Sequence, residues 1–212
     1  MRKIDCIEQT KNYIRNQFLK SDIFETAHEA LYRLEHSYRV ANIGEEIAKA
    51  EGLDIEVLVV ACLLHDISYC FPFTDNNYLN HGRDSAKLVR PFLDQLGFSK
   101  NEINEICFGI AIHVDDVSDF EGIRSPLALS VGDADNIDRF DVYRIYDTLE
   151  NLCFSEMPIE EKIQHIDKVL LRLPILREEK LGTKKAEELW IEKIDFQILF
   201  YRKLKDQLSK SN

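Results

Sequence analysis

The sequence contains few of the residues that interrupt helices. Its 212 residues include five prolines and eight glycines, which are the two least favourable residues in a helix interior. Long segments therefore run without interruption, and nearly all of them carry apolar residues at helical spacing. Convincing alternation of apolar and polar residues, the pattern of a half-buried strand, is lacking. The sequence predicts an all-α protein.

Two further absences bear on where the protein works. No stretch approaches the roughly 18 apolar residues of a membrane-spanning helix, and the first segment, MRKIDCIEQTKNYIRNQF, has no apolar signal-peptide core. The five cysteines are scattered, with no CxxC pair and no zinc-ribbon spacing. This pattern favours a reducing compartment over a disulfide framework. We expect a soluble, cytoplasmic protein.

An excess of positive charge is lacking as well, because the formal net charge is −11 at pH 7. Nucleic acids and anionic membranes attract proteins of the opposite sign. We therefore expect neither a nucleic-acid polymer nor a membrane as a partner. A small anionic substrate would require a metal ion or a local basic cluster to reverse the field. The sequence does not indicate an oligomeric state.

The sequence does contain a series of amphipathic segments. The expected helices are 3–20, 26–51, 54–67, 82–96, 100–114, 125–151, 158–173 and 183–209. Pro91 predicts a kink or break, Pro174 is expected to end the helix before it, and Thr183 is a plausible N-cap. The segment SYCFPFTDNNYLNHG is expected to be a loop. A chain of this length corresponds to one domain, so we expect a single helical bundle over residues 1–212, with C-terminal helices at 158–209.

Several histidines and aspartates lie next to apolar runs or close to expected turns. His65 and Asp66 end an apolar run, His36 lies within a helix, His81 opens one and His113 closes one. The stretch LSVGDADNIDRF adds three carboxylates, those of Asp133, Asp135 and Asp138. Buried polar groups must be paired, and a cation would pair imidazoles and carboxylates together. A metal site and separately satisfied core residues are both compatible with this spacing. His28 and His165, in ordinary amphipathic helices, are interpreted as structural or surface residues.

The order of these residues resembles the metal-ligand signature of the HD-domain superfamily of metal-dependent phosphohydrolases. LEHSYRVANIGEEIAKAEGLD is similar to the first helix of that family, ACLLHDI to its namesake motif, and GDADNIDRF to the element that supplies the last aspartate. HGRDSAKLV and IAIHVDD resemble segments that supply two extra histidines in some members. The resemblance covers about residues 28–145. A weaker one extends into EEKLGTKKAEELW and is to small stand-alone bacterial members.

The resemblance implies a helical bundle around a site for divalent transition metal, that is Fe, Mn, Co, Ni or Zn, as two ions or one. The implied metal ligands are His36, His65, Asp66, His81, His113 and Asp135. His81 and His113 match the added ligands of dinuclear members, with Asp66 bridging the two ions and His65 and Asp66 central to catalysis. Asp135 is chosen from the acidic run because it matches the family's ligand. Asp133 and Asp138 would then support the ligands or begin a helix.

The activity that the resemblance implies is hydrolysis of a phosphate ester or anhydride of a small phosphorylated substrate, for example a nucleotide. The sequence lacks an H-T-x-G motif after His113, a GYP motif and a glutamate soon after Asp66. These departures argue against dinucleoside polyphosphate hydrolysis, cyclic di-GMP hydrolysis and single-metal nucleotidases. Two alternatives stay open: a di-iron oxygenase with the same ligands, and a non-catalytic bundle that binds a metal or nucleotide in a regulatory role.

Basic and aromatic residues near the motifs are candidates for substrate contact or for ordinary surface and packing roles. The basic candidates are Arg39, Arg83, Lys87 and Arg139, because guanidinium and ammonium groups bind phosphate oxygens. Arg83 and Lys87 are preferred, since they lie four residues apart on one helix face near His81. The aromatic loop is expected either to cover the site or to close the end of the bundle through Tyr69, Phe71 and Phe73.

Overall fold

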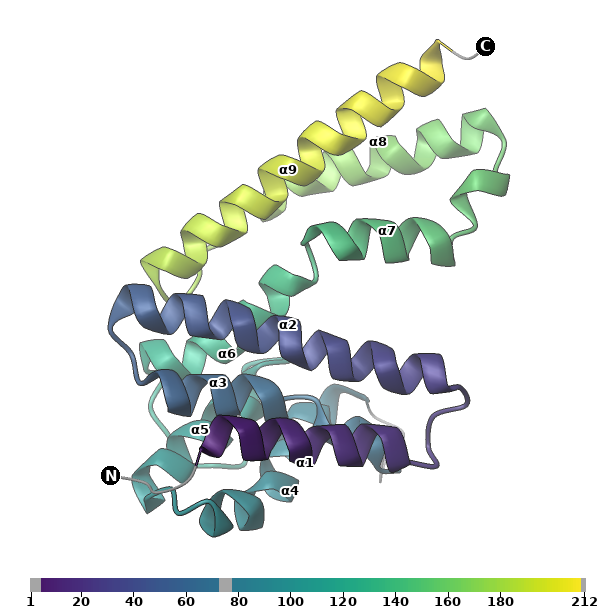
Figure 1. Ribbon diagram of the computed structural model, residues 1–212. Coiled ribbons are helices and arrows are strands. Elements are labelled where there is room, and N and C mark those ends of the chain that lie inside the picture. The colour runs from purple at the N-terminus through teal and green to yellow at the C-terminus, as the bar shows by residue number, and fades with distance from the viewer. Residues whose placement is uncertain (1–4, 73–77, 211–212) are drawn as a thin grey trace. The chain divides into compact units, whose positions relative to one another are not determined.

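The computed structural model describes residues 5–72 and 78–210 (Figure 1). Within these residues every regular element is a helix, which confirms the all-α prediction. The α-helices are α1 (Cys6–Lys20), α2 (Ala27–Glu51), α3 (Ile55–Leu64), α4 (His81–Gln95), α5 (Lys100–Ile112), α6 (Pro126–Asp138), α7 (Val142–Asn151), α8 (Ile159–Leu176) and α9 (Lys184–Ser209). Short 3₁₀ turns are η1 (Ile67–Cys70), η2 (Tyr78–Asn80) and η3 (Phe154–Glu156).

The chain divides into two compact units, Met1–Asp135 and Asn136–Asn212. Each unit is described by itself below. The expectation that residues 1–212 act as one domain stays a prediction.

Side-chain caps fix where several helices begin. The Thr26 hydroxyl accepts a hydrogen bond from the Glu29 amide, and the Asp54 carboxylate accepts one from the Val57 amide. Ser99 and Glu102 form a reciprocal capping box at the start of α5. These contacts satisfy amides that have no partner within the helix. Local sequence therefore sets the starts of α2, α3 and α5, three of the helices around the site described below.

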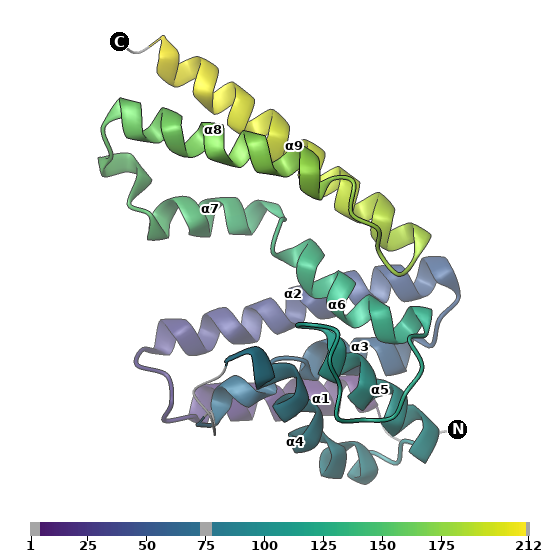
Figure 2. The same ribbon diagram turned by 180° about the vertical axis from the view of Figure 1, so that it is seen from behind.

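Helix α3 forms the core of the first unit. Its residues from Val57 to Leu64 are all buried, so the helix is apolar on every side. It packs against α1, α2 and α5, and α1 also packs against α2 (Figures 1 and 2). Burial of a large apolar side chain contributes about 1.5–3 kcal/mol. His65 and Asp66, which directly follow α3, are therefore attached to a tightly packed helix and are themselves buried.

Two glycines allow helices to approach closely next to the site. A Cβ at Gly82, near the start of α4, would lie 2.8 Å from the Ile110 carbonyl oxygen of α5. A Cβ at Gly109 of α5 would lie 3.0–3.1 Å from Val131 and Ala128 of α6. Both distances are shorter than ordinary carbon contacts. Glycine at these positions lets α4, α5 and α6 bring their polar ends together.

The second unit is built around the pairing of α8 with α9, which run side by side (Figures 1 and 2). Trp190 of α9 is buried, and its indole nitrogen donates a hydrogen bond to the Leu176 carbonyl at 2.8 Å. The Phe140 ring packs edge-on against Trp190, with 4.8 Å between ring centroids. The Gln197 side-chain amide donates to the Phe140 carbonyl at 2.8 Å. These contacts join the segment before α7 to the long C-terminal helix.

Most predicted helices are present, and the predicted N-cap Thr183 accepts a hydrogen bond from the Ala186 amide. One predicted helix, 125–151, is wrong, because α6 and α7 are separate and the Asp141 carboxylate caps α7. Helix α8 contains Pro174 and ends at Leu176, so the predicted stop before Pro174 is also wrong. Helix α4 likewise continues through Pro91 without a break. Proline removes one helical hydrogen bond, and burial of the neighbouring helix face offsets that loss.

The described residues contain no helix that combines the length and the hydropathy needed to cross a membrane.

Candidate metal centre

Several helices of the first unit bring histidines and aspartates close together. His36 lies within α2, while His65 is the C-cap of α3 and Asp66 follows it. His81 is the first residue of α4 and His113 is the C-cap of α5. The sixth residue, Asp135, lies in α6. The structure thus brings together all six residues that the sequence proposed as metal ligands.

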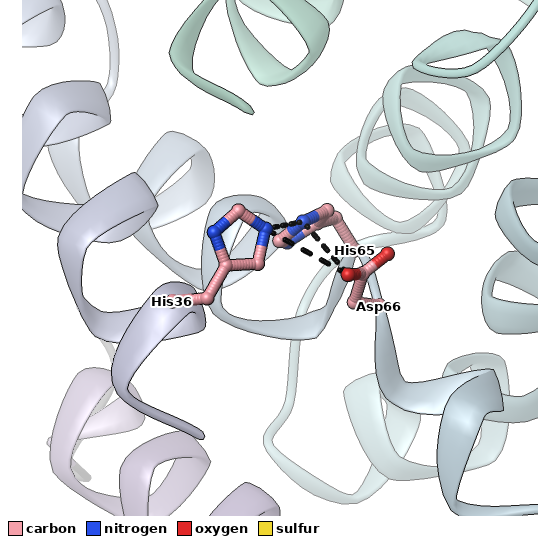
Figure 3. Close-up of side chains that lie close together, drawn as sticks. All are labelled: His36, His65 and Asp66. Carbon is pink, nitrogen blue, oxygen red and sulfur yellow. Dashed lines mark hydrogen bonds and ion pairs between the residues drawn. The ribbon is translucent and has the colours of Figure 1, made fainter. Parts of the chain in front are cut away.

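One group of side chains forms around His36 (Figure 3). Its Nε2 atom lies 3.2 Å from the Nε2 atom of His65 and 3.2 Å from Oδ1 of Asp135. The Oδ2 atom of Asp66 lies 3.7 Å from His36 Nε2 and 3.6 Å from His65 Nε2. Two imidazoles and two carboxylates therefore converge on a small volume.

A second group forms on the other oxygen of the same carboxylate. Oδ1 of Asp66 lies 3.3 Å from His81 Nε2 and 3.8 Å from His113 Nε2. The two Nε2 atoms are 3.1 Å apart. Asp66 therefore stands between two groups of ligand atoms and offers a different oxygen to each.

Backbone carbonyls determine which nitrogen of three of these rings carries the proton. The Nδ1 atoms of His65, His81 and His113 lie 2.8, 2.6 and 2.6 Å from carbonyl oxygens of Cys62, Tyr78 and Ile110 respectively. A carbonyl oxygen only accepts hydrogen bonds, so each Nδ1–H is the donor and each neutral ring presents a bare Nε2 lone pair. The contacts also fix the ring orientations, as expected for metal-binding histidines.

This donor set fits a transition-metal ion. Facing lone pairs on His81 and His113, 3.1 Å apart, repel each other unless a proton or a cation lies between them. Ligand atoms bound to one ion at about 2.1 Å would be separated by about 3–3.4 Å, close to the shortest distances here. Three overlapping sets of potential metal ligands result: His36, His65 and Asp66; His65, His113 and Asp135; and Asp66, His81 and His113.

The protonation states suit metal binding too. Burial lowers the pKa of His65, which is fully buried, to about 4, so this ring is neutral at pH 7. Burial would raise the pKa values of Asp66 and Asp135, but the surrounding histidines hold both well below the usual range. Burial also disfavours a charged His113, yet hydrogen bonding to Asp66 and the charge of Asp135 raise its pKa. The two buried carboxylates thus draw positive charge into the site, either as a proton or as a metal ion.

Sequence reasoning missed Arg33 as a residue of this site. Its Nη1 atom donates to Oδ2 of Asp66 at 2.9 Å, and its guanidinium lies 3.6 Å from the centroid of the Tyr69 ring. The Tyr69 ring is in turn 5.0 Å from that of His81. The available signal was spacing, because Arg33 precedes His36 by one helical turn and so shares its face.

Arg83 and Lys87, the two preferred substrate contacts, both form hydrogen bonds or ion pairs with other residues of the chain. Arg83 donates hydrogen bonds to the Asp115 carboxylate, to the Val117 and Leu79 carbonyls and to the Asn80 side chain. Lys87, more than half exposed, forms an ion pair with Asp119 at 2.6 Å. The structure therefore ties both cations to the segment after His113, and their role as substrate contacts stays a prediction.

The remaining predicted residues have varied positions. Arg39 is partly buried, Arg139 is exposed and Phe71 is partly buried, while Phe73 lies outside the described residues. Asp133 lies within α6 and Asp138 ends it, so neither begins a helix. Of the two histidines set aside, His28 is exposed and His165 is partly buried, near the rings of Phe154 and Tyr201.

Helices that bring buried histidines and aspartates together form a helical domain with a candidate metal site. Residues 33–140, which include all six residues of the site, match the HD domain family. The chain belongs to this family. The buried histidine and aspartate groups are those expected of an HD-domain metal site.

Solved structures of small HD-superfamily proteins share the fold. A predicted HD-superfamily hydrolase from an uncultured Thermotogales bacterium is 21% identical, with a TM-score of 0.67 over 98% of this chain and 95% of that one. YpgQ from Bacillus subtilis in complex with ADP is 19% identical, with a TM-score of 0.64 over 98% and 97%. An HD-superfamily hydrolase from Bacillus thuringiensis is 17% identical, with a TM-score of 0.67 over 96% of both chains. Comparison with curated protein sequences gave no match.

Proposed function

We propose that this protein is a metal-dependent phosphohydrolase that cleaves a phosphate ester or anhydride bond in a small substrate. The observation that carries the proposal is the position of the buried Asp66 carboxylate between two groups of histidine nitrogens. The Asp135 carboxylate lies beside one of these groups. Family membership supports it, as do the structural neighbours described as HD-superfamily hydrolases.

We assign two adjacent ion positions that share Asp66. His36, His65, Asp66 and Asp135 would hold one ion, and Asp66, His81 and His113 would hold the other. Two divalent cations carry more positive charge than the two carboxylates neutralise. The site would then attract a phosphate group even though the chain has a net charge of −11.

Divalent ions bound by these residues would supply Lewis-acid chemistry, lowering the pKa of a water and polarising a phosphoryl oxygen. The chain's own residues prepare the site for that chemistry. The carbonyls of Cys62, Tyr78 and Ile110 keep three histidine rings in the tautomer that binds metal. Asp66 orients both groups of ligands through its two oxygens. Burial of His65 and Asp66 keeps their surroundings dry, which strengthens electrostatic interactions with the reacting phosphate.

A nucleotide is the substrate class that we propose to test first. The structurally similar YpgQ was crystallised with ADP, and a diphosphate presents the oxygen atoms that a pair of divalent ions binds.

The test combines elemental analysis with a substrate screen. Protein loaded with Mn²⁺, Fe²⁺, Co²⁺, Ni²⁺ or Zn²⁺ should hold close to two ions per chain and release phosphate or pyrophosphate from a nucleotide or another phosphate ester. Turnover that consumes oxygen without phosphate release would instead identify a di-iron oxygenase. Tight binding of metal and nucleotide without turnover would identify a regulatory binding domain.

A further inference from the structure

We infer that Arg33 is the substrate-contacting arginine of this site and binds a non-bridging oxygen of the phosphate group. This inference rests on the proposed function, since it names a residue for the same site. Three observations carry it: where the guanidinium lies, what holds it there and how the charges around it are arranged.

Arg33 lies at the border between the buried ligands and solvent. The Asp66 side chain is 5% exposed, whereas that of Arg33 is 29% exposed, and the two are joined by a 2.9 Å ion pair. A substrate that enters from solvent toward Asp66 meets the guanidinium on this side. A guanidinium has five N–H donors, and one hydrogen bond from Nη1 accounts for its contact with Asp66.

Tyr69 holds the guanidinium in a defined orientation. The ring lies 3.6 Å from the Arg33 carbon Cζ, which is within the distance of a cation–π contact. Tyr69 belongs to η1, directly after His65 and Asp66, so the contact is fixed to the same turn as those ligands. A cation oriented in advance loses less entropy when it binds an anion.

The charge arrangement favours an anion beside Arg33 once metal is bound. The oxygen that Arg33 contacts, Oδ2 of Asp66, is also the one that faces His36 and His65. A divalent ion near that oxygen and the guanidinium would be like charges at short range. A phosphate oxygen that contacts both relieves this repulsion, and a guanidinium provides the planar N–H geometry for such contacts.

The two preferred basic candidates, Arg83 and Lys87, are placed differently. Arg83 is 11% exposed and its Nη atoms bond four acceptors of the surrounding chain. Lys87 is 54% exposed and pairs with Asp119. Arg33, in contrast, forms an ion pair with a carboxylate of the site, that of Asp66. Position therefore favours Arg33 as the phosphate contact.

The experiment compares Arg33→Ala, Arg33→Lys and Tyr69→Leu with wild type. Arg90→Ala serves as the matched control, because Arg90 is exposed on α4, bonds Asn104 and is not part of the site. Each protein is loaded with Mn²⁺ and its metal content is measured. Inorganic phosphate and ADP are then titrated separately in a calorimeter.

We expect Arg33→Ala to keep its metal and to bind both probes roughly 10- to 100-fold more weakly, the effect of losing a charged hydrogen bond. Arg33→Lys should recover part of the affinity, because lysine keeps the positive charge but lacks the paired, planar N–H donors of a guanidinium. Tyr69→Leu should weaken binding a few-fold, and Arg90→Ala should match wild type. In turnover assays the loss in Arg33→Ala should appear in KM as well as in kcat.

Unchanged phosphate affinity in a metal-loaded Arg33→Ala protein would overturn the inference. Loss of metal from that variant would also overturn it, since Arg33 would then act by positioning Asp66. Wild type that holds metal but binds neither probe contradicts the assignment of Arg33 and leaves the metal site intact. Wild type that holds no metal removes the proposed function and this inference together.

Discussion

Asp66 is the residue on which both groups of ligand atoms depend. Its Oδ2 atom faces His36 and His65, and its Oδ1 atom faces His81 and His113. A carboxylate buried to this degree is stable only when charged partners or hydrogen bonds replace its hydration. Arg33 and the surrounding imidazoles supply these partners in the structure, and the ions would add to them in the loaded protein.

The first prediction concerns His65 and Asp66. Asp66→Ala should abolish tight metal binding and any phosphatase activity, because Asp66 offers an oxygen to both ion positions. His65→Ala should abolish activity and lower the metal content by about one ion, because His65 belongs to one of the two positions. His28→Ala, which changes an exposed histidine, should behave as wild type. Elemental analysis and phosphate release provide the measurement. Full activity in either site variant would show that the assignment is wrong.

The second prediction separates the two ion positions. His81→Ala and His113→Ala should each lower the metal content from about two ions per chain toward one, because they belong to one group and His36 to the other. Manganese titration followed by electron paramagnetic resonance measures this stoichiometry and the coupling between ions. Two bound ions in both variants would contradict the dinuclear arrangement.

The six proposed ligands could be singled out from the sequence because each lies in a short motif that resembles one of the HD-domain family. Arg33 shares a helix face with His36, but this spacing alone does not identify it. A charged residue on an amphipathic helix is usually solvated, and only the fold places the Arg33 guanidinium against Asp66. The preference for Arg83 and Lys87 had the same weakness. Their spacing identified a shared helix face without revealing Asp115 and Asp119 as their partners.

At the scale of elements, Arg83 connects the two segments that carry His81 and His113. It donates to Leu79 and Asn80, just before His81, and to Asp115 and Val117, just after His113. The Nδ1–H of His81 bonds the neighbouring Tyr78 carbonyl. Arg83 therefore helps to set the distance between two ligand-bearing helix ends.

The third prediction follows from this connection. Arg83→Ala should weaken binding of the ion held by His81 and His113 by about tenfold or more while sparing the other ion, as loss of supporting contacts around a metal typically does. Lys87→Ala, one turn away and largely exposed, is the matched control. Isothermal titration with Mn²⁺ reports the two affinities. Equal weakening at both positions would indicate a general loss of structure.

The fourth prediction concerns the close approach of α4 to α5. Gly82→Ala should lower the free energy of unfolding by about 1–3 kcal/mol, because the new methyl group meets backbone oxygens of Ile110 and Ala111 at 2.8–3.0 Å. Higher helix propensity of alanine would oppose this by up to about 1 kcal/mol. Chemical denaturation measures the difference. A more stable variant would mean that the two helices can separate without cost.

Apolar periodicity predicted where helices exist, but it did not predict the break between α6 and α7 or the end of α8. Residues 139–141 interrupt the expected helix 125–151, and the Asp141 carboxylate then begins α7. Pro174 was expected to end α8, yet the neighbouring Leu173 is buried and the helix continues to Leu176. The first boundary follows a local cap that periodicity does not report, and the second is accompanied by burial of Leu173, which local propensity does not predict.

At the scale of the whole molecule, metal binding and folding should be linked. All six proposed ligands belong to the first unit, Met1–Asp135, and come from five different helices or their ends. Ligands scattered in this way converge only in the folded chain, so a bound ion stabilises the folded state. The division into two units was not apparent in the sequence, which has no linker of distinctive composition.

The fifth prediction is a metal-dependent melting temperature. Mn²⁺ at about 100 times its dissociation constant should stabilise the protein by about 2.7 kcal/mol per site. For a chain of this size each site then raises the melting temperature by about 5–10 °C. Differential scanning calorimetry with and without EDTA tests this. Asp66→Ala should show no such rise, and an equal rise in that variant would place the metal elsewhere.

The central claim is that these six side chains hold metal, and anomalous diffraction from crystals of Mn- or Fe-loaded protein tests it most directly. The account predicts one anomalous peak among His36, His65, Asp66 and Asp135, and a second among Asp66, His81 and His113. A loaded crystal with no peak at these side chains, or with peaks only at other residues, would contradict it.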